Sequence, residues 1–457
     1  MGNVNRIKPL LSRHLTPARI FILSFIVIIL GGALFLWQSF STAKGSLTFI
    51  DALFTSTSAV CVTGLVVIDL GQDLSLTGQV ITLFLFQVGG LGIITFSTIF
   101  FVLMGRGISF KGREIAQSTF LHTPRQDFFL ILKSVLWSTF IFESLGTLLL
   151  WFRFAKDFSP AQAFYQALYH AVSAFNNCGY SLLGKNLMPY QGDWLVNLTV
   201  MGLIVIGGIG FIVQYEILSR LGGKLKKLSV HSKMVLYTTS ILIFLGTFLF
   251  YIAEEKNVLG KLPLSDQILT SLFQSITPRT CGFNTVDIGA LTNTTLLLLL
   301  VLMFIGGSPG STAGGIKTTS AALLTFLIWN RFRGNETVNL FRRTIPQEIV
   351  SRTISIIFAS GFLIFLISSI LLLTAESSAP PLESRNIFVD YVFETVSAFG
   401  TVGLSMGITP TLNGVQKAAI IFMMFIGRVG PLTLAFSLSR KTMKEGITYA
   451  EEGVMVG

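Results

Sequence analysis

Long apolar segments separated by short polar ones dominate this chain. Residues 20–37, 296–305 and 356–373 contain no charged side chain. A helix of about 20 such residues crosses the hydrocarbon core of a bilayer, which is about 30 Å thick. The composition agrees, because 51% of the residues are hydrophobic and only 12% are charged, with a mean hydropathy of +0.71. The pattern predicts an all-α polytopic membrane protein.

The apolar pattern recurs four times as a unit of spanning helix, short half-helix, glycine turn and second spanning helix. We therefore expect four helix–pore-loop–helix repeats, with eight spanning helices, arranged pseudo-fourfold around one pore. The expected helices are 19–41, 48–59 and 77–104; 128–154, 160–175 and 194–221; 234–253, 264–277 and 293–332; and 353–374, 387–399 and 414–439. The expected boundaries are 1–18 for a cytoplasmic N-terminal segment, 19–104, 128–221, 234–332 and 353–439 for the pore repeats, and 440–457 for a cytoplasmic C-terminal tail.

A second feature recurs in phase with the first. Clusters of small residues fall at a corresponding place in each second spanning helix, at 88–92, 206–210, 305–310 and 426–430. Small residues are common wherever transmembrane helices pack closely, and this explanation suffices for the first two clusters taken alone. Two features in register across four copies support the repeat.

The four glycine turns are the candidate ion-binding residues. A ring of backbone carbonyls can replace the water shell of a dehydrating monovalent cation, and half-helices that point their C-terminal ends at the pore also favour a cation. Glycine supplies backbone angles that other residues rarely adopt. We expect Thr63, Thr280 and Thr401 to add hydroxyl oxygens at one level, and Asn177 an amide. The turns comprise Val62, Thr63, Gly64, Leu65; Asn177, Cys178, Gly179, Tyr180; Thr280, Cys281, Gly282, Phe283; and Thr401, Val402, Gly403, Leu404.

The third repeat departs from the others and carries the candidate gate. So much glycine, serine and proline in its second helix is incompatible with a continuous helix, and a loop below the turns is a natural gate. A phosphate-binding loop is a poor alternative, because Ile316 stands where lysine should follow the glycine and no strand precedes it. The loop residues are Gly306, Gly307, Ser308, Pro309, Gly310, Ser311, Thr312, Ala313, Gly314, Gly315 and Lys317.

Arg428 stands where the other small-residue clusters have glycine. An arginine within a spanning helix normally faces the bundle interior or a cavity. We expect a fixed positive charge below the turns that limits passage together with the loop. The alternative is a structural pair with a carboxylate or with carbonyls at a helix end.

The net charge of +11 reflects topology. Basic residues gather between the apolar hairpins, for example at Lys224, Lys226, Lys227 and Lys233, whereas the turn-bearing segments hold more acids. Cytoplasmic loops carry an excess of lysine and arginine, so both termini are expected in the cytoplasm. Because topology explains the basic residues, we expect no nucleic acid as a partner. The first apolar run is too long for a signal peptide and is expected to stay as a spanning helix.

Other polar residues in or near apolar segments leave alternatives open. Asp51 and Glu394 either draw cations to the mouth or cap and hold their half-helices. Glu143 is either functional, as intramembrane carboxylates often are, or faces a polar seam between repeats. The three cysteines, Cys61, Cys178 and Cys281, are expected to be small side chains that fit behind the crowded turns, since an odd count argues against a disulfide framework.

The turns, the loop and Arg428 together closely resemble those of the Trk/Ktr/HKT superfamily of potassium transporters, most of all the KtrB-type subunit, over essentially the whole chain. The resemblance implies potassium uptake, often sodium-stimulated, with potassium as the transported ion, sodium as activator or coupled ion, and no cofactor in this chain. It implies a homodimer with one pore per subunit, and a cytoplasmic ring of KtrA-type nucleotide-binding subunits. Glycine in all four turns, where sodium-selective plant relatives have serine in the first, favours potassium.

Three alternatives remain on sequence grounds. The first is a sodium or mixed monovalent cation transporter of the same fold. The second is the translocating subunit of an ATP-driven potassium pump, similar to KdpA, which would carry additional spanning helices. The third is an intramembrane enzyme, which would need paired acids, a histidine cluster or a nucleophile–base pair; Glu143 and His170 alone do not provide one.

Overall fold

The computed structural model describes residues 17–43, 45–92, 128–223, 225–375, 380 and 384–438, and these form a helical, multi-pass membrane protein. The first helix of each predicted repeat is long: α2 (Pro17–Trp37), α7 (Phe128–Phe154), α11 (Val230–Glu254) and α15 (Gln347–Leu373). A shorter helix follows each of them, namely α3 (Phe49–Val60), α8 (Pro160–Phe175), α12 (Leu264–Ile276) and α16 (Arg385–Gly400). The predicted order of a spanning helix and a half-helix therefore holds in all four repeats.

The second helix is interrupted in the second, third and fourth repeats, and here the prediction of continuous helices at 194–221 and 414–439 was wrong. The segments are α4 (Leu76–Leu91), α9 (Trp194–Gly208) with α10 (Phe211–Leu221), α13 (Asn293–Phe304) with α14 (Thr318–Phe332), and α17 (Gly414–Val429) with α18 (Pro431–Leu438). Gly92, Gly210 and Gly430 stand at the ends with φ of 82°, 95° and 90°. These angles lie outside the helical region and suit glycine alone. Helices α9 and α10 consequently meet at 102°.

Among the described residues, four helices are long and apolar enough to cross a membrane, or five if the bent pair α9 and α10 counts as one span. The four are α2, α7, α11 and α15, and shorter apolar helices include α4 and α13. Eight spans thus remain a prediction, and the part of 77–104 that follows Gly92 lies outside the described residues.

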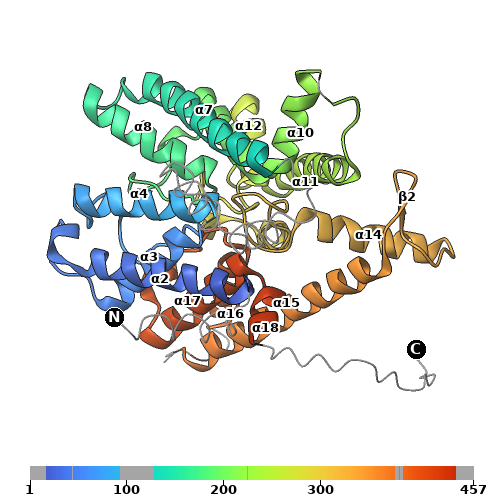
Figure 1. Cartoon of the computed structure of the whole chain (residues 1–457). Coiled ribbons are helices and arrows are strands. Elements are labelled where there is room, and N and C mark those ends of the chain that lie inside the picture. The colour runs from blue at the N-terminus through green and yellow to red at the C-terminus, as the bar shows by residue number, and fades with distance from the viewer. Residues whose placement is uncertain are drawn as a thin grey trace, which may run out of the picture.

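The repeats contact one another in a cyclic order. Helix α4 contacts α8, α9 contacts α12 and α13 contacts α16, while α3 and α2 of the first repeat contact α17 and α18 of the last. In Figure 1 the first repeat, in blue, accordingly lies beside the red helices of the fourth, and the green second repeat lies beyond α4. A small hairpin of β1 (Asn339–Leu340) and β2 (Arg343–Thr344) joins the third repeat to the fourth.

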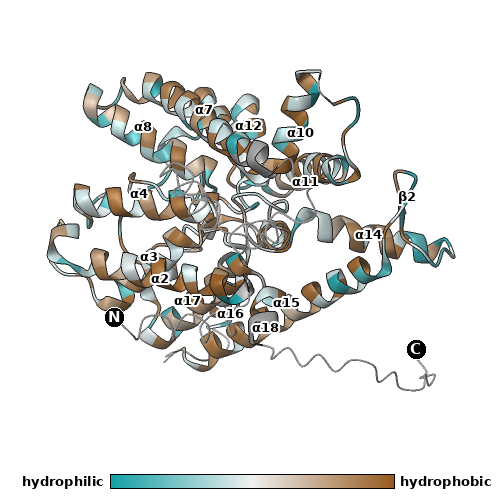
Figure 2. Ribbon diagram, in the orientation of Figure 1, coloured by the Kyte–Doolittle hydropathy of each residue, from teal (hydrophilic) through white to brown (hydrophobic). Residues whose placement is uncertain are grey.

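Apolar residues, brown in Figure 2, predominate along the long helices. Phe244 on α11 is 76% exposed, as is Phe358 on α15. Large apolar residues exposed on this scale would be unfavourable in water and are expected where lipid surrounds the protein. Hydrophilic residues gather instead at the far end of α14 and at the hairpin (Figure 2).

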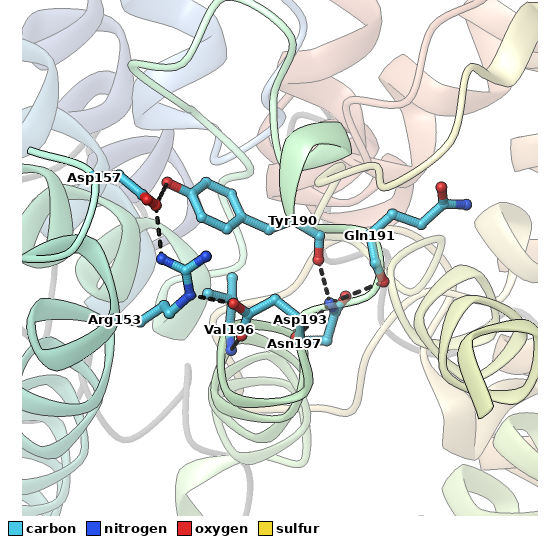
Figure 3. A network of polar contacts seen from close by, with 7 residues as sticks. All are labelled: Arg153, Asp157, Tyr190, Gln191, Asp193, Val196 and Asn197. Carbon is cyan, nitrogen blue, oxygen red and sulfur yellow. Dashed lines mark hydrogen bonds and ion pairs between the residues drawn. The ribbon is translucent and has the colours of Figure 1, made fainter. Parts of the chain in front are cut away.

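The end of each first helix is tied to the start of the second helix of the same repeat. The N-terminal caps of the second helices are Ser75, Asp193, Thr292 and Asn413. Ser75 bonds the carbonyl of Phe40, Thr292 bonds Glu254, and Asn413 bonds the carbonyl of Thr374. In the second repeat the link is ionic: Arg153 lies between Asp157 and Asp193, and the Tyr190 hydroxyl donates to Asp157 at 2.8 Å (Figure 3). These links close the segment of each repeat that contains the half-helix and the turn.

Candidate functional site

The four glycine turns meet at one place. A Cβ atom on Gly64 would lie 2.1 Å from the Cys178 carbonyl oxygen, and one on Gly179 would lie 1.8 Å from that of Cys281. For Gly282 the atom is the Val402 carbonyl oxygen, at 2.2 Å. For Gly403 it is the Thr63 carbonyl oxygen, at 2.3 Å. Each turn therefore packs its glycine against the carbonyl group of the next turn, and the fourth packs against the first. With contacts this close, a side chain at any of the four glycines would force the turns to shift.

The turns also share one backbone conformation. The glycines have φ between 73° and 91°. The residue two positions earlier is also left-handed in every copy, with φ of 56° at Val62, 58° at Asn177, 75° at Thr280 and 50° at Thr401. Positive φ is costly for β-branched residues and is found mainly where function requires it. In each turn, one residue separates the two left-handed residues. This alternation lets the successive backbone carbonyls of the turn face the same side, as a ring of carbonyl ligands requires.

The shared conformation corrects the expected level of the side-chain oxygens. Asn177, Thr280 and Thr401 each stand two residues before their glycine, but Thr63 stands one residue before Gly64. The counterpart in the first repeat is Val62, which offers no side-chain oxygen. Three polar side chains therefore occupy the level, and the predicted set of four was wrong.

These polar side chains are buried and incompletely hydrogen-bonded. The Asn177 amide and the Thr280 hydroxyl lie 3.2 Å apart. The hydroxyl oxygens of Thr63 and Thr401 are buried without a hydrogen-bond partner among the described residues. Buried polar atoms are nearly always paired, so these two hydroxyl oxygens are exceptions within the group of turns.

Serine side chains of the half-helices hold the turns in place. Ser58 Oγ accepts a hydrogen bond from Gly64 N at 3.1 Å and donates one to the Leu65 carbonyl at 2.8 Å. Ser397 Oγ accepts from Gly403 N at 3.1 Å in the same way. Sequence analysis missed both residues, although serine stands six residues before the glycine in three of the four copies. A comparison of the repeats extended into the half-helices would have found them.

The loop between α13 and α14 lies against the turns. It begins and ends at a bridge between Ile305 and Ile316. Ser308 N donates to the Gly208 carbonyl at 3.0 Å, and Thr312 Oγ1 donates to the Phe175 carbonyl at 3.3 Å, both in the second repeat. Gly315 N donates to the Gly427 carbonyl of the fourth repeat at 3.3 Å. A Cβ atom on Gly314 would lie 2.2 Å from Thr401 Oγ1, so the loop passes directly beside a turn.

Arg428 ties this loop to the first repeat. Its guanidinium donates to the carbonyl oxygens of Thr312 in the loop and of Gly89 in α4, and to that of Gly90 at 3.2 Å. Pairing of Arg428 with backbone carbonyls is the structural alternative that the sequence left open. One of these carbonyls, that of Thr312, nevertheless belongs to the candidate gate. Lys317 lies in the same region and donates from Nζ to the Ala313 carbonyl at 2.9 Å, closing the loop on itself.

Glu143 has structural partners. Asn176 Nδ2 donates to Glu143 Oε1 at 3.0 Å, and Gln87 Nε2 donates to Glu143 Oε2 at 3.4 Å. These contacts form a polar seam between the first two repeats, one of the two roles considered for Glu143. The three cysteines are buried and free. Over the described ranges, no group of histidine, cysteine and acidic residues could hold a metal ion.

Comparison with known proteins identifies the family. A family model described as "Cation transport protein", TrkH, matches residues 13–445. The chain is 38% identical over 445 residues to the Ktr system potassium uptake protein B of Bacillus subtilis (strain 168), covering 97% of each protein. It is 35% identical over 450 residues to the potassium/sodium uptake protein NtpJ of Enterococcus hirae, covering 97% of this chain and 98% of that protein.

A solved structure shares the fold. The crystal structure of the potassium transporter TrkH from Vibrio parahaemolyticus matches with a TM-score of 0.72 and 20% identity, covering 92% of this chain and 83% of that one. The relatives are transport proteins and not enzymes, which removes the intramembrane enzyme from consideration. The resemblance found in the turns, the loop and Arg428 is thus confirmed, and the chain belongs to the TrkH family of cation transport proteins.

Proposed function

We propose that this chain is the translocating subunit of a potassium uptake system, with four repeats arranged pseudo-fourfold around one pore. The observation that carries the proposal is the closed cycle of contacts among Gly64, Gly179, Gly282 and Gly403, each set against the carbonyl of the next turn. The printed names of two relatives, both uptake proteins for potassium, support the choice of ion.

The turns act as the selectivity filter. Potassium loses its water as it enters the ring, and the carbonyl oxygens replace that water. The half-helices α3, α8, α12 and α16 direct the negative ends of their dipoles toward the ion. The free hydroxyls of Thr63 and Thr401 supply further oxygens next to the ring. Because each glycine is crowded by backbone, the ring has little room to adjust to a smaller ion.

The loop 306–317 and Arg428 form the gate. The hydrogen bonds of the loop to the second and fourth repeats, and of Arg428 to the loop and to the first repeat, support a closed position of this gate. A guanidinium there opposes the passage of a cation by charge as well as by bulk. Conduction requires the loop to release Thr312 and Gly315 and move aside.

Regulation comes from outside this chain. The resemblance implies a homodimer, a cytoplasmic ring of KtrA-type nucleotide-binding subunits, and stimulation by sodium. Both termini and the basic loops between repeats face the cytoplasm, following the positive-inside rule. The basic loops are then the natural contacts for the regulatory ring.

Uptake of rubidium into cells that lack potassium uptake tests the proposal. We expect uptake when the chain is expressed with a regulatory subunit, competition by potassium, and weaker competition by sodium. Uptake that potassium fails to inhibit would overturn the assignment of the ion. Sodium competing as well as potassium would favour the second candidate, a mixed monovalent cation transporter, which the name of the Enterococcus hirae relative supports.

A further inference from the structure

Two ionisable side chains occupy the same position in two different repeats. His170 stands nine residues before Gly179 on α8, and Glu394 stands nine residues before Gly403 on α16. Both side chains are completely buried. Since the second and fourth repeats each contact the first and the third, these two residues lie on opposite sides of the four turns. Neither takes part in the gate or in the carbonyl ring.

His170 holds the chain that leaves the second turn. Its Nδ1 lies 2.7 Å from the Gln166 carbonyl oxygen, which can only accept, so this nitrogen carries the proton of the neutral ring. Nε2 then accepts from the hydroxyl of Ser181, at 2.8 Å, two residues after Gly179. The ring also stacks on Phe283, with centroids 5.9 Å apart and planes at 24°. His170 therefore contacts the outgoing segments of two neighbouring turns.

Glu394 holds the chain that leaves the fourth turn. Its Oε1 accepts a hydrogen bond from the Thr409 hydroxyl. Thr409 Oγ1 in turn lies 3.0 Å from the hydroxyl of Ser405, which stands two residues after Gly403 and matches Ser181. Oε2 of Glu394 is buried without a partner in the part of the chain that the structure describes. A buried carboxylate in this setting is costly, so its presence calls for a role.

The residue at the same position in the first repeat also supports a turn, namely that of the second repeat. Thr55 stands nine residues before Gly64, and its carbonyl accepts from the Tyr180 hydroxyl at 3.0 Å. Tyr180 directly follows Gly179, as Phe283 follows Gly282. Residues at this position in three repeats therefore support the chain that leaves a turn. Thr55 does so through its backbone carbonyl, whereas His170 and Glu394 use their side chains.

We propose that His170 and Glu394 are positioning residues for ion selection: they fix the outgoing chain of the second and fourth turns and so set the width of the ring. The inference rests on the proposed function, because it requires the ring to be the place where the ion is selected. A ligand ring selects by small differences in position, and those positions are only as firm as the hydrogen bonds behind them.

Competition between rubidium and sodium in uptake measures this role directly. We expect His170→Ala and Glu394→Ala to lower the discrimination of rubidium from sodium by about three- to tenfold, the effect of one lost hydrogen bond. His170→Gln and Glu394→Gln keep an acceptor near the lost one and should restore most of the discrimination. The milder variants Ser181→Ala and Thr409→Val remove the same bonds from the other side and should lower it in the same direction.

A matched control separates selection from folding. Glu254, at the end of α11, is another completely buried carboxylate. It accepts hydrogen bonds from Thr292 and Thr295 at the start of α13 and from Asn257, and none of these residues belongs to a turn. Glu254→Gln should reduce thermal stability and leave ion discrimination unchanged. Discrimination that stays unchanged in folded Ser181→Ala and Thr409→Val, while Gly403→Ser lowers it, would overturn the inference alone. If Gly403→Ser also left discrimination unchanged, both the filter assignment and this inference would be wrong.

Discussion

Lys417 Nζ lies 2.7 Å from the carboxylate of Asp51, and this ion pair joins the last repeat to the first. The contact matters because the other neighbouring repeats are consecutive in the chain, whereas these two are not. Asp51 also accepts from the Thr48 hydroxyl at 2.6 Å, within the first turn of α3. Of the two roles considered for Asp51, the structure therefore supports holding the half-helix.

Removing one member of this pair should destabilise the protein. The side chains of Lys417 and Asp51 are only 14% and 17% exposed, so Lys417→Met leaves a largely buried carboxylate unpaired. We expect the free energy of unfolding to fall by about 1–3 kcal/mol. Thermal unfolding in detergent of Lys417→Met, Asp51→Asn and the double variant measures it. Effects of the single variants that simply add in the double variant would show that the pair contributes nothing.

Gly403→Ser should weaken selection of potassium over sodium. A Cβ atom at Gly403 meets the Thr63 carbonyl at 2.3 Å, so the ring must widen or twist to admit it. Gly407 is the matched control, because its φ of 96° is equally unfavourable for serine but no atom lies within 4 Å of its Cβ position. Sodium competition in rubidium uptake should change in Gly403→Ser and not in Gly407→Ser. An equal effect of both would point to a general loss of folding.

Arg428→Ala should raise uptake in the absence of a regulatory subunit. The variant frees the Thr312 carbonyl and removes the positive charge below the turns. Deletion within Ser308–Gly314 should act in the same direction, because these residues form the contacts with the second repeat. Basal rubidium flux in proteoliposomes is the measurement, with Arg220→Gln, in the last turn of α10, as control. Flux that is unaltered in both gate variants would contradict a gate built from the loop and Arg428.

Glu143→Gln should preserve transport. Its partners, Asn176 and Gln87, are side chains of the seam between the first two repeats, and an amide can keep one contact with them. We expect rubidium uptake close to that of the native chain with a modest fall in melting temperature. Abolished uptake in a variant that remains folded would instead place this carboxylate on the ion path.

The Arg153–Asp157–Tyr190 network should make stability depend on pH. The hydrogen bond from Tyr190 is the main cause that lowers the pKa of Asp157 below its ordinary value, and Arg153 adds to it. A carboxyl with a lowered pKa stabilises the fold above its ordinary pKa of about 3.9, and this contribution is lost as the pH falls through the lowered value. Tyr190→Phe should therefore lower the melting temperature at neutral pH, and the difference should narrow below about pH 4. A difference that does not change with pH would exclude the carboxylate as its source.

The local features of this protein follow from its residues. Long, predominantly apolar segments predict the helices α2, α7, α11 and α15, because apolar side chains are favoured where a helix faces lipid. The four glycines predict turns, and the loop 306–317 cannot be helical, because its composition does not allow a regular hydrogen-bond ladder. The family is recognisable from the same residues.

Only the tertiary structure decided which groups meet. The side-chain type of Thr63 suggested that it matches Thr280 and Thr401. Comparison of the backbone angles of the four turns showed that Val62 is their counterpart instead. The break at Gly210 comes with a close backbone contact from another repeat, since the Pro309 carbonyl oxygen lies 2.6 Å from a Cβ position on Gly210. The pair of Lys417 with Asp51, 366 residues apart, likewise exists only once the chain has closed on itself. Hydrophobic patterning fixes which segments form helices, whereas long-range polar contacts depend on a packing that no local pattern encodes.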